Sequence, residues 1–97
     1  MLHGAVRWEE ISRNGLQILD NIVRSFGTRS FSKQEIAEAT GISLANIGYN
    51  LKSLRRFSVI DIKKNGSTSY LYRLAVPIEE AVRELRVRGF SPVALVG

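Results

Sequence analysis

The sequence contains no cysteine and only one histidine, His3. The lack of cysteine excludes a disulfide framework, a thiol nucleophile and a thiolate metal site. One histidine near the N-terminus cannot build a zinc site and is a poor basis for a Ser-His-Asp triad. We also find no paired acid and base and no glycine-rich phosphate loop. We therefore expect no enzyme activity, no catalytic residue, no metal and no cofactor.

Long hydrophobic runs are also absent, and none approaches the roughly 20 residues needed to cross a bilayer. Residues 1–10 lack the basic segment followed by an apolar one that marks a secretory signal peptide. The chain has 97 residues, of which 44% are hydrophobic, and this is enough for one domain with a modest core. We expect residues 1–97 to form a single cytoplasmic domain with no membrane partner, and nothing suggests a small-molecule ligand.

Acidic residues are scarce in the middle of the chain, which concentrates the net charge of +5 there. Residues 1–40 and 77–97 are each neutral overall, whereas residues 41–76 hold six basic residues against Asp61 alone. The six are Lys52, Arg55, Arg56, Lys63, Lys64 and Arg73. A positive field confined to one third of a chain suits a polyanion partner. An ordinary solvated surface can carry a similar excess of basic residues. The local structure of this third must therefore decide between a polyanion-binding surface and an ordinary one.

Two helices are predicted in the first 40 residues. Apolar residues recur at helical spacing over residues 12–26, and Gly27 is suited to end that helix. Ser32 and Glu35 have the spacing of a capping box, in which each side chain accepts a hydrogen bond from the other residue's main-chain N–H. This box predicts the start of a second helix, which runs to about Ala39.

A third helix is predicted over residues 43–57, with Ser43 as its N-cap. One face carries three apolar residues at i, i+4 and i+7, and these should belong to the core. They are Ile47, Leu51 and Leu54. The other faces are polar and basic, which predicts that they are exposed.

A β-hairpin is predicted after the third helix, from two β-rich segments within residues 59–74. Asn65-Gly66 lies between them and favours a two-residue type I′ turn, because both residues tolerate a positive φ. Such a turn would place Ile60 opposite Leu71, and a longer turn would shift this register.

Two short helices, a tight turn and an adjoining hairpin resemble the winged helix-turn-helix domain of small bacterial and archaeal transcription regulators. The resemblance covers about residues 15–76 and rests on Phe-Ser-Lys-Gln-Glu-Ile-Ala-Glu-Ala-Thr-Gly-Ile-Ser at 31–43 and Leu-Lys-Ser-Leu at 51–54. It implies an α+β, mostly helical fold with a three-helix core, a β-hairpin wing and an additional C-terminal helix. Many relatives have glycine just after the third helix, whereas this chain has Phe57-Ser58. A serine with a positive φ costs about 1 kcal/mol there.

The resemblance implies that helix 43–57 enters the major groove of double-stranded DNA and that the wing, residues 59–74, reaches the backbone or an adjacent minor groove. Short polar side chains suit base edges, and asparagine can form a bidentate pair with adenine. Lysine and arginine suit phosphates. The predicted DNA-binding residues are Ser43, Asn46, Tyr49, Asn50, Lys52, Ser53, Arg55, Arg56, Lys63 and Lys64.

Several of these residues have an ordinary structural alternative. Asn46 and Asn50 could simply face solvent, and Tyr49 could pack on a neighbouring helix. Lys63 and Lys64 could protect an edge strand, because lysine at an edge discourages aggregation. These alternatives stay open at the level of the sequence.

The segment 77–97 has two interpretations. A helix is predicted over residues 77–88, with Pro77 as its first residue. This helix could pack on the core of the domain, which spans about residues 12–76, or it could pair with the same helix of a second copy in a homodimer. The apolar tail favours the homodimer, because a monomer would leave it partly exposed. The tail residues concerned are Phe90, Val93, Leu95 and Val96.

The sequence as a whole therefore favours a sequence-specific, double-stranded DNA-binding transcription regulator on the nucleoid. The first alternative is a winged-helix module for protein–protein interaction, with Val82 and Leu85 as the contacting residues. The second is a non-specific DNA-binding protein of chromatin, replication or segregation.

Overall fold

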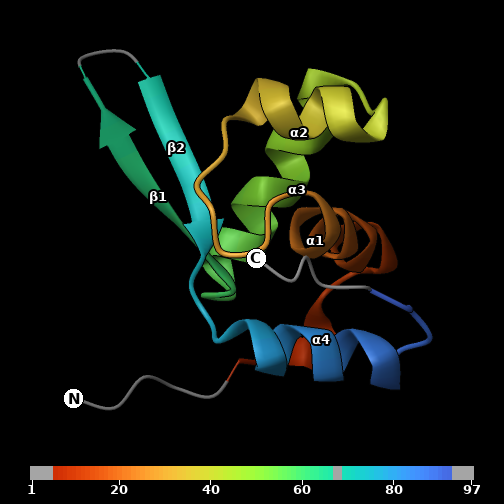
Figure 1. The fold of residues 1–97 in the computed structure, drawn as a ribbon. Helices are drawn as coiled ribbons and strands as arrows, with labels where there is room; N and C mark the ends of the chain where they lie inside the picture. The colour runs from red at the N-terminus through yellow and green to blue at the C-terminus, as the bar shows by residue number, and fades with distance from the viewer. Residues whose placement is uncertain (1–5, 67–68, 93–97) are drawn as a thin grey trace.

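The structure, a computed structural model, describes residues 6–66 and 69–92 of the chain. Within these ranges it has four α-helices, one short 3-10 helix and a two-stranded antiparallel hairpin (Figure 1). In order, the elements are η1 (Trp8–Glu10), α1 (Arg13–Ser25), α2 (Lys33–Thr40), α3 (Leu44–Arg56), β1 (Ile60–Asn65), β2 (Ser69–Leu74) and α4 (Ile78–Val87). The predicted class is confirmed: α+β, mostly helical, with three core helices, a hairpin and a further C-terminal helix.

Helix α1 begins and ends as its capping residues predict. The Ser12 side chain accepts a hydrogen bond from the Gly15 N–H at 3.1 Å, which gives one N–H of the first turn a partner. Gly27 follows the last turn with a φ of 60°, and its N–H bonds the carbonyls of Ile22 and Val23. Glycine stands there because this way of ending a helix needs a left-handed residue.

Helices α2 and α3 form a helix-turn-helix unit with the predicted caps. The Ser32 hydroxyl accepts from the Glu35 N–H at 3.1 Å, and the Glu35 carboxylate accepts from the Ser32 N–H at 2.8 Å. Gly41, with a φ of 74°, ends α2. Ser43 then caps α3 by accepting from the Asn46 N–H at 3.3 Å. The short connection fixes the direction in which α3 leaves α2.

The core lies between the helices and the base of the hairpin. The three apolar residues predicted for the inner face of α3 are buried. They are Ile47, Leu51 and Leu54. Phe31, just before α2, forms an isolated β-bridge with Tyr72 of β2 and stacks on its ring at a centroid distance of 6.0 Å. This bridge ties the wing to the start of α2.

The hairpin pairs in a different register from the one that a two-residue turn predicts. Asn65 is still in the ladder and lies opposite Ser69. Three residues therefore connect the strands, two of which lie outside the described part of the chain. Ile60 lies opposite Leu74 and not opposite Leu71, so the predicted register is wrong.

Ser58, between α3 and β1, adopts a φ of 65° and is the only non-glycine among the described residues with a positive φ. The chain therefore keeps the left-handed connection for which many winged-helix proteins use glycine. Directly after it, the Val59 N–H bonds the Leu54 carbonyl at 3.0 Å, and the Val59 carbonyl accepts from the Ala75 N–H at 2.9 Å. These bonds fix the point at which the wing leaves α3.

Helix α4 covers the core with one face. Its residues Ala81 and Leu85 are fully buried. Pro77 is the N-cap and not, as predicted, the first helical residue. The full burial of Leu85 also corrects the expectation that this residue contacts a partner protein, because its side chain packs in the core of its own domain.

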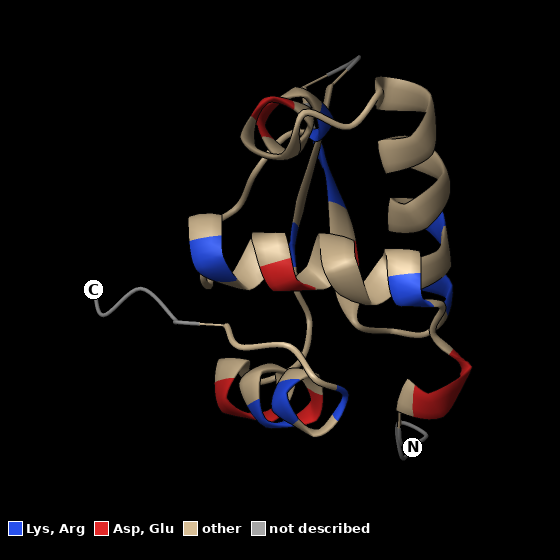
Figure 2. Ribbon diagram, turned by 90° about the vertical axis from the view of Figure 1, so that its right-hand side faces the viewer, with Lys and Arg blue, Asp and Glu red and all other residues tan. Residues whose placement is uncertain are grey.

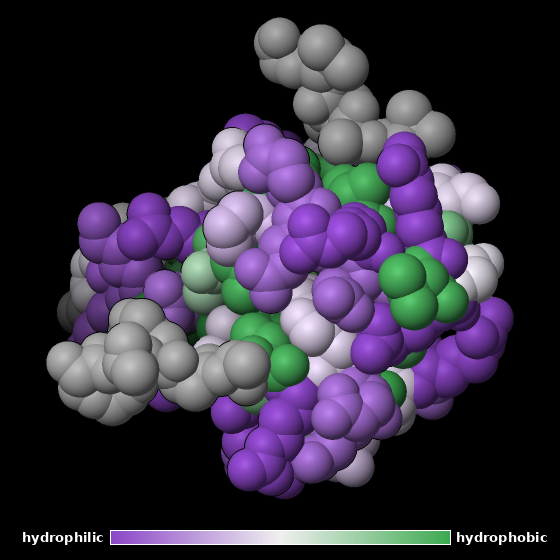
Figure 3. All heavy atoms as spheres, turned by 90° about the horizontal axis from the view of Figure 1, so that it is seen from below, coloured by the Kyte–Doolittle hydropathy of each residue, from purple (hydrophilic) through white to green (hydrophobic). Residues whose placement is uncertain are grey.

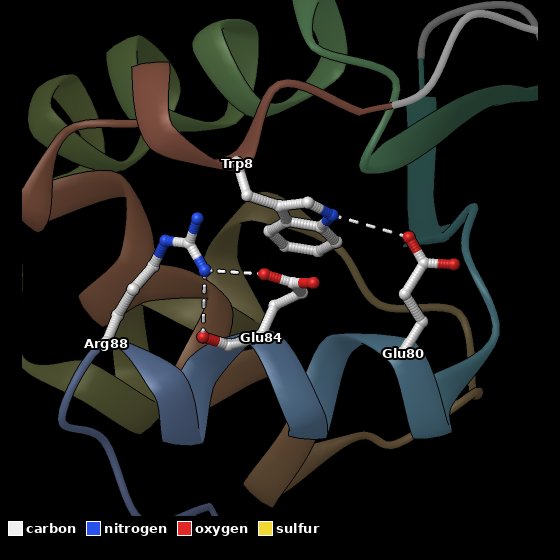
Figure 4. A network of polar contacts seen from close by, with 4 residues as sticks. All are labelled: Trp8, Glu80, Glu84 and Arg88. Atoms are coloured by element: carbon white, nitrogen blue, oxygen red, sulfur yellow. Dashed lines mark hydrogen bonds and ion pairs between the residues drawn. The ribbon is translucent and has the colours of Figure 1, made fainter.

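A polar network joins α4 to the N-terminal segment (Figure 4). The indole Nε1 of Trp8 donates to the Glu80 carboxylate at 3.3 Å. On the other side of the indole, the Arg88 guanidinium donates to the carboxylate and to the main-chain oxygen of Glu84. Trp8 is itself buried, so η1 and α4 are packed together as parts of one core.

The start of the C-terminal tail differs from its interpretation as an exposed apolar segment. Phe90 is buried in the core, and the Arg13 guanidinium lies over its ring at 4.9 Å from the centroid. Phe90 therefore cannot argue for a dimer. The other three tail residues, Val93, Leu95 and Val96, lie outside the described residues.

Candidate nucleic-acid interface

Helix α3 turns an apolar face to the core and a polar face outward. Asn46, Tyr49 and Lys52 are exposed, and Asn46 and Tyr49 also line an open cleft between α1 and α3. Tyr49 is 75% exposed, so it does not pack into a neighbouring helix. The outward face thus offers an amide, a phenol and an ammonium group along two turns of helix.

The two serines predicted on this face differ in how free they are. Ser43 is exposed, but its hydroxyl oxygen is used as the cap that accepts from the Asn46 N–H. Its O–H can still donate outward, because a hydroxyl donates and accepts at once. Ser53 is half-buried at the side of the helix. Neither residue is removed from the predicted set.

The structure corrects the prediction for Asn50, because this residue is only 7% exposed. Its Nδ2 donates to the main-chain oxygen of Asn46 at 2.8 Å, and the residue lines a cleft of about 550 Å³ between α1 and α3. The reason is its position on the helix. Residue 50 follows Ile47 by one turn and precedes Leu54 by one turn, so it lies at the edge of the buried face. The expectation that Asn50 is an outward-facing residue is therefore wrong.

The five basic residues predicted to meet DNA are all exposed. Lys52, Arg55 and Arg56 lie on the C-terminal half of α3, and Lys63 and Lys64 lie on β1 (Figure 2). None of the ion pairs between described residues involves any of them. Their charges are thus free to act on a polyanion.

The observed register separates the two lysines of the wing. Lys64 lies opposite Tyr70, on the hairpin face that also carries half-buried Tyr72 and turns toward the helices. Lys63 lies opposite Leu71 on the other face. The two side chains leave the hairpin on opposite sides, so they would reach different segments of a bound backbone.

Lys33, at the start of α2, is a basic residue near this surface that sequence reasoning missed. It lines a groove of about 520 Å³ between α2 and the wing. Its Nζ also lies close to α3, since a Cβ built on Gly48 would be 3.3 Å from it. In the sequence Lys33 lies between the two residues of the capping box, in a segment with no net charge, and nothing local marks it as a binding residue. The signal that could have found it is the expected proximity of α2 to the wing.

Other kinds of site find no support in the parts of the chain that the structure describes. No group of three or more histidine, cysteine, aspartate or glutamate side chains could hold a metal ion there. No helix in these parts has both the length and the apolar character needed to span a membrane.

No protein-family model matches the sequence, and no curated protein matches it. Solved structures do match. One is a possible transcriptional regulatory protein from Mycobacterium bovis, fragment 1–100, with a TM-score of 0.60 and 27% identity over 79% of this chain and 75% of that chain. Another, with a TM-score of 0.63 and 16% identity, is the adhesin competence repressor AdcR of Streptococcus pyogenes. That match covers 82% of this chain but only 58% of AdcR.

A solution structure of a winged helix-turn-helix DNA-binding domain from Mycobacterium bovis, fragment 1–100, matches with a TM-score of 0.58. Identity is 23%, over 91% of this chain and 86% of that domain, which is described as homodimeric and as a possible ArsR-family regulator. These likenesses confirm the winged helix-turn-helix fold. In its terms, α2 and α3 are the helix-turn-helix, and β1 and β2 are the wing.

Proposed function

We propose that this chain, which has the winged helix-turn-helix fold, is a sequence-specific double-stranded DNA-binding protein that regulates transcription. The observation that carries the proposal is the outward face of α3. That face combines exposed Asn46 and Tyr49 with three cations on the next turns that form no ion pair with another described residue, and the wing stands beside it. Solved structures of similar fold include proteins described as transcriptional regulators and as a DNA-binding domain.

The proposed mechanism assigns different tasks to the two halves of α3. The helix is narrow enough to lie in the major groove, which is about 12 Å wide. Asn46 and Tyr49 on its N-terminal half then face base edges, and the amide of Asn46 can pair bidentately with adenine. The cations of the C-terminal half and of the wing face phosphates, which fix the register of the protein on the duplex. The residues we propose for DNA contact are Ser43, Asn46, Tyr49, Lys52, Ser53, Arg55, Arg56, Lys63 and Lys64.

We further propose that the protein binds DNA as a homodimer whose contact is the outer face of α4. A single α3 reads few base pairs, and a two-fold dimer places two such helices on half-sites about 34–36 Å apart. Val87 is 73% exposed on α4, and half-buried Ile78 and Val82 adjoin it along a shallow groove. Figure 3 looks at the underside of the molecule, where α4 lies, and shows hydrophobic patches between hydrophilic ones. The similar domain from Mycobacterium bovis is homodimeric.

Selection from random duplexes is the direct test of sequence specificity. The proposal predicts an enriched motif that is bound at least about 10³-fold more tightly than unrelated duplex. A variant with Lys52→Gln, Arg55→Gln and Arg56→Gln should bind all duplexes weakly, because its phosphate contacts are lost. Equal affinity for every duplex would favour the non-specific DNA-binding alternative. Failure to bind any duplex would favour a protein-interaction module. A protein with the proposed function would act on the nucleoid, in the cytoplasm.

A further inference from the structure

We propose that the groove between α2 and the wing holds one sugar–phosphate backbone of the bound DNA, and that Lys33 is a phosphate contact in it. The inference rests on the proposed function, because it presupposes that α3 enters the major groove. It adds a residue and a surface that lie outside the helix and the lysine pair from which the function was argued.

The arrangement of the elements requires a backbone at this place. If α3 lies in the major groove and the wing reaches toward the adjacent minor groove, one phosphate backbone separates the two grooves. That backbone must pass between the helix-turn-helix and the hairpin. The groove of about 520 Å³ lies there, with residues 32–34 at the start of α2 and Leu44 of α3 on one side and residues 69–72 of β2 on the other.

The chemistry of the lining suits a sugar–phosphate chain. Among the described residues that line the groove, Lys33 alone is charged. The carboxylate nearest to Lys33 in the sequence is that of Glu35. It accepts a hydrogen bond from the Ser32 N–H in the capping box and lies 3.8 Å from the Arg29 guanidinium, so its charge already has a partner. Leu44 is 48% exposed and supplies apolar surface of the kind that deoxyribose can cover.

The wing adds a second cation to the same side. Lys64 lies opposite Tyr70 in the ladder, so both side chains lie on the hairpin face that turns toward the helices. Tyr70 itself lines the groove and is 49% exposed. A backbone in the groove would thus meet Lys33 from the helix-turn-helix and Lys64 from the wing.

Gly48 explains why the ammonium group of Lys33 can lie against α3. A Cβ at position 48 would be 3.3 Å from the Nζ and 3.7 Å from the Cε of Lys33. A methyl group there would displace the Nζ of Lys33 slightly, because the contact with the Nζ is tighter than most real Cβ contacts, whereas the contact with the Cε is ordinary. Gly48 is therefore a positioning residue for Lys33.

The test is the salt dependence of duplex binding by Lys33→Gln, measured by fluorescence anisotropy on the selected motif and on a scrambled duplex. A phosphate contact carries no base information, so affinity should fall by a similar factor, roughly three- to tenfold, for both duplexes. The slope of log K against log salt should become shallower by about 0.9 for each bound protomer, and so by about 1.8 for the proposed homodimer. Arg7→Gln, which removes the same charge from an exposed residue just before η1, is the matched control and should leave the slope unchanged.

Gly48→Ala is the second variant and tests the positioning. Alanine should raise the melting temperature, because glycine is a poor helix former and the nearest atom is the mobile end of a lysine. Gly48→Ala should nevertheless lower the affinity for DNA. This loss should be smaller when Gly48→Ala is added to the Lys33→Gln variant than when it is added to the wild-type chain. An unchanged slope for Lys33→Gln, or a loss confined to the selected motif, would overturn the inference while leaving the proposed function intact. A wild-type chain that binds no duplex would overturn both.

Discussion

The side-chain amide of Asn50 is bonded to the main-chain oxygen of Asn46, 2.8 Å away and one turn earlier on α3. This bond holds Asn50 at the edge of the core, whereas the Asn46 side chain is exposed. Two asparagines that look equivalent in the sequence therefore have different roles. One belongs to the packing of α3 against α1, and the other is free to meet a ligand.

Asn46→Ala and Asn50→Ala form a matched pair on the same helix. Loss of a bidentate asparagine–adenine pair should cost about 1–3 kcal/mol of discrimination, so Asn46→Ala should relax the selected motif at one base pair. Asn50→Ala should leave duplex affinity within about threefold and change the free energy of unfolding by roughly 1 kcal/mol or less. Anisotropy titrations and urea unfolding measure the two effects. Equal losses of discrimination for the two variants would contradict the assignment.

Ser58→Gly should stabilise the fold. The φ of 65° at Ser58 is strained for a residue with a Cβ and unstrained for glycine. Relief of this strain, less the extra freedom that glycine gives to the unfolded chain, should add up to about 1 kcal/mol to the free energy of unfolding. Urea unfolding followed by circular dichroism measures it. The control is Ser30→Gly at an exposed loop residue without a positive φ, which should be neutral or destabilising. If both substitutions destabilise equally, the strain is absent.

Trp8 should be a main anchor between η1 and α4. Trp8→Ala should reduce the free energy of unfolding by about 3–5 kcal/mol, because a large buried ring is lost. Trp8→Phe keeps an aromatic ring and loses the bond to Glu80, so it should cost clearly less. Thermal unfolding by circular dichroism compares them. A loss below about 1 kcal/mol for Trp8→Ala would show that the N-terminal segment is not part of the core.

Val87→Lys tests the proposed dimer face. Val87 is 73% exposed, so a lysine there should not disturb the folded protomer. Buried in a dimer, the ammonium group would be costly, and the dimer dissociation constant should rise at least tenfold. Sedimentation equilibrium measures the constant. Ala39→Lys, a change of the same sign at an exposed position on α2, is the control and should have no effect. A wild-type chain that stays monomeric on its own and on a two-half-site duplex would contradict the dimer.

The sequence predicts the features of this fold that depend on neighbouring residues. The capping box of Ser32 and Glu35, the cap at Ser43 and the glycine that ends α1 each involve groups within four or five residues. Side chains and main-chain groups so close in sequence meet in any fold that contains the helix. For this reason the order of helices and hairpin followed from local patterns.

The features that the sequence did not predict depend on contacts between distant segments or on small rotations. Asn50 lies at the edge of the apolar face of α3, where a modest rotation of the helix decides between burial and exposure. The hairpin register depends on how far the ladder extends before the turn, and the ladder continues through Asn65. The place of Lys33 beside Gly48 requires the packing of α2 on α3. None of these can be read from a local motif.

The salt dependence of duplex binding by the wild-type chain tests the central claim most directly. About four to six phosphate contacts from α3, the wing and α2 of each protomer, or about eight to twelve in the proposed homodimer, predict a slope of log K against log salt of about −7 to −11 between roughly 50 and 200 mM salt. A slope in that range, measured by anisotropy on the selected motif, is the result expected if the outward face of α3 binds a polyanion. A slope near zero, or no binding at the lowest salt, would show that this face does not bind DNA.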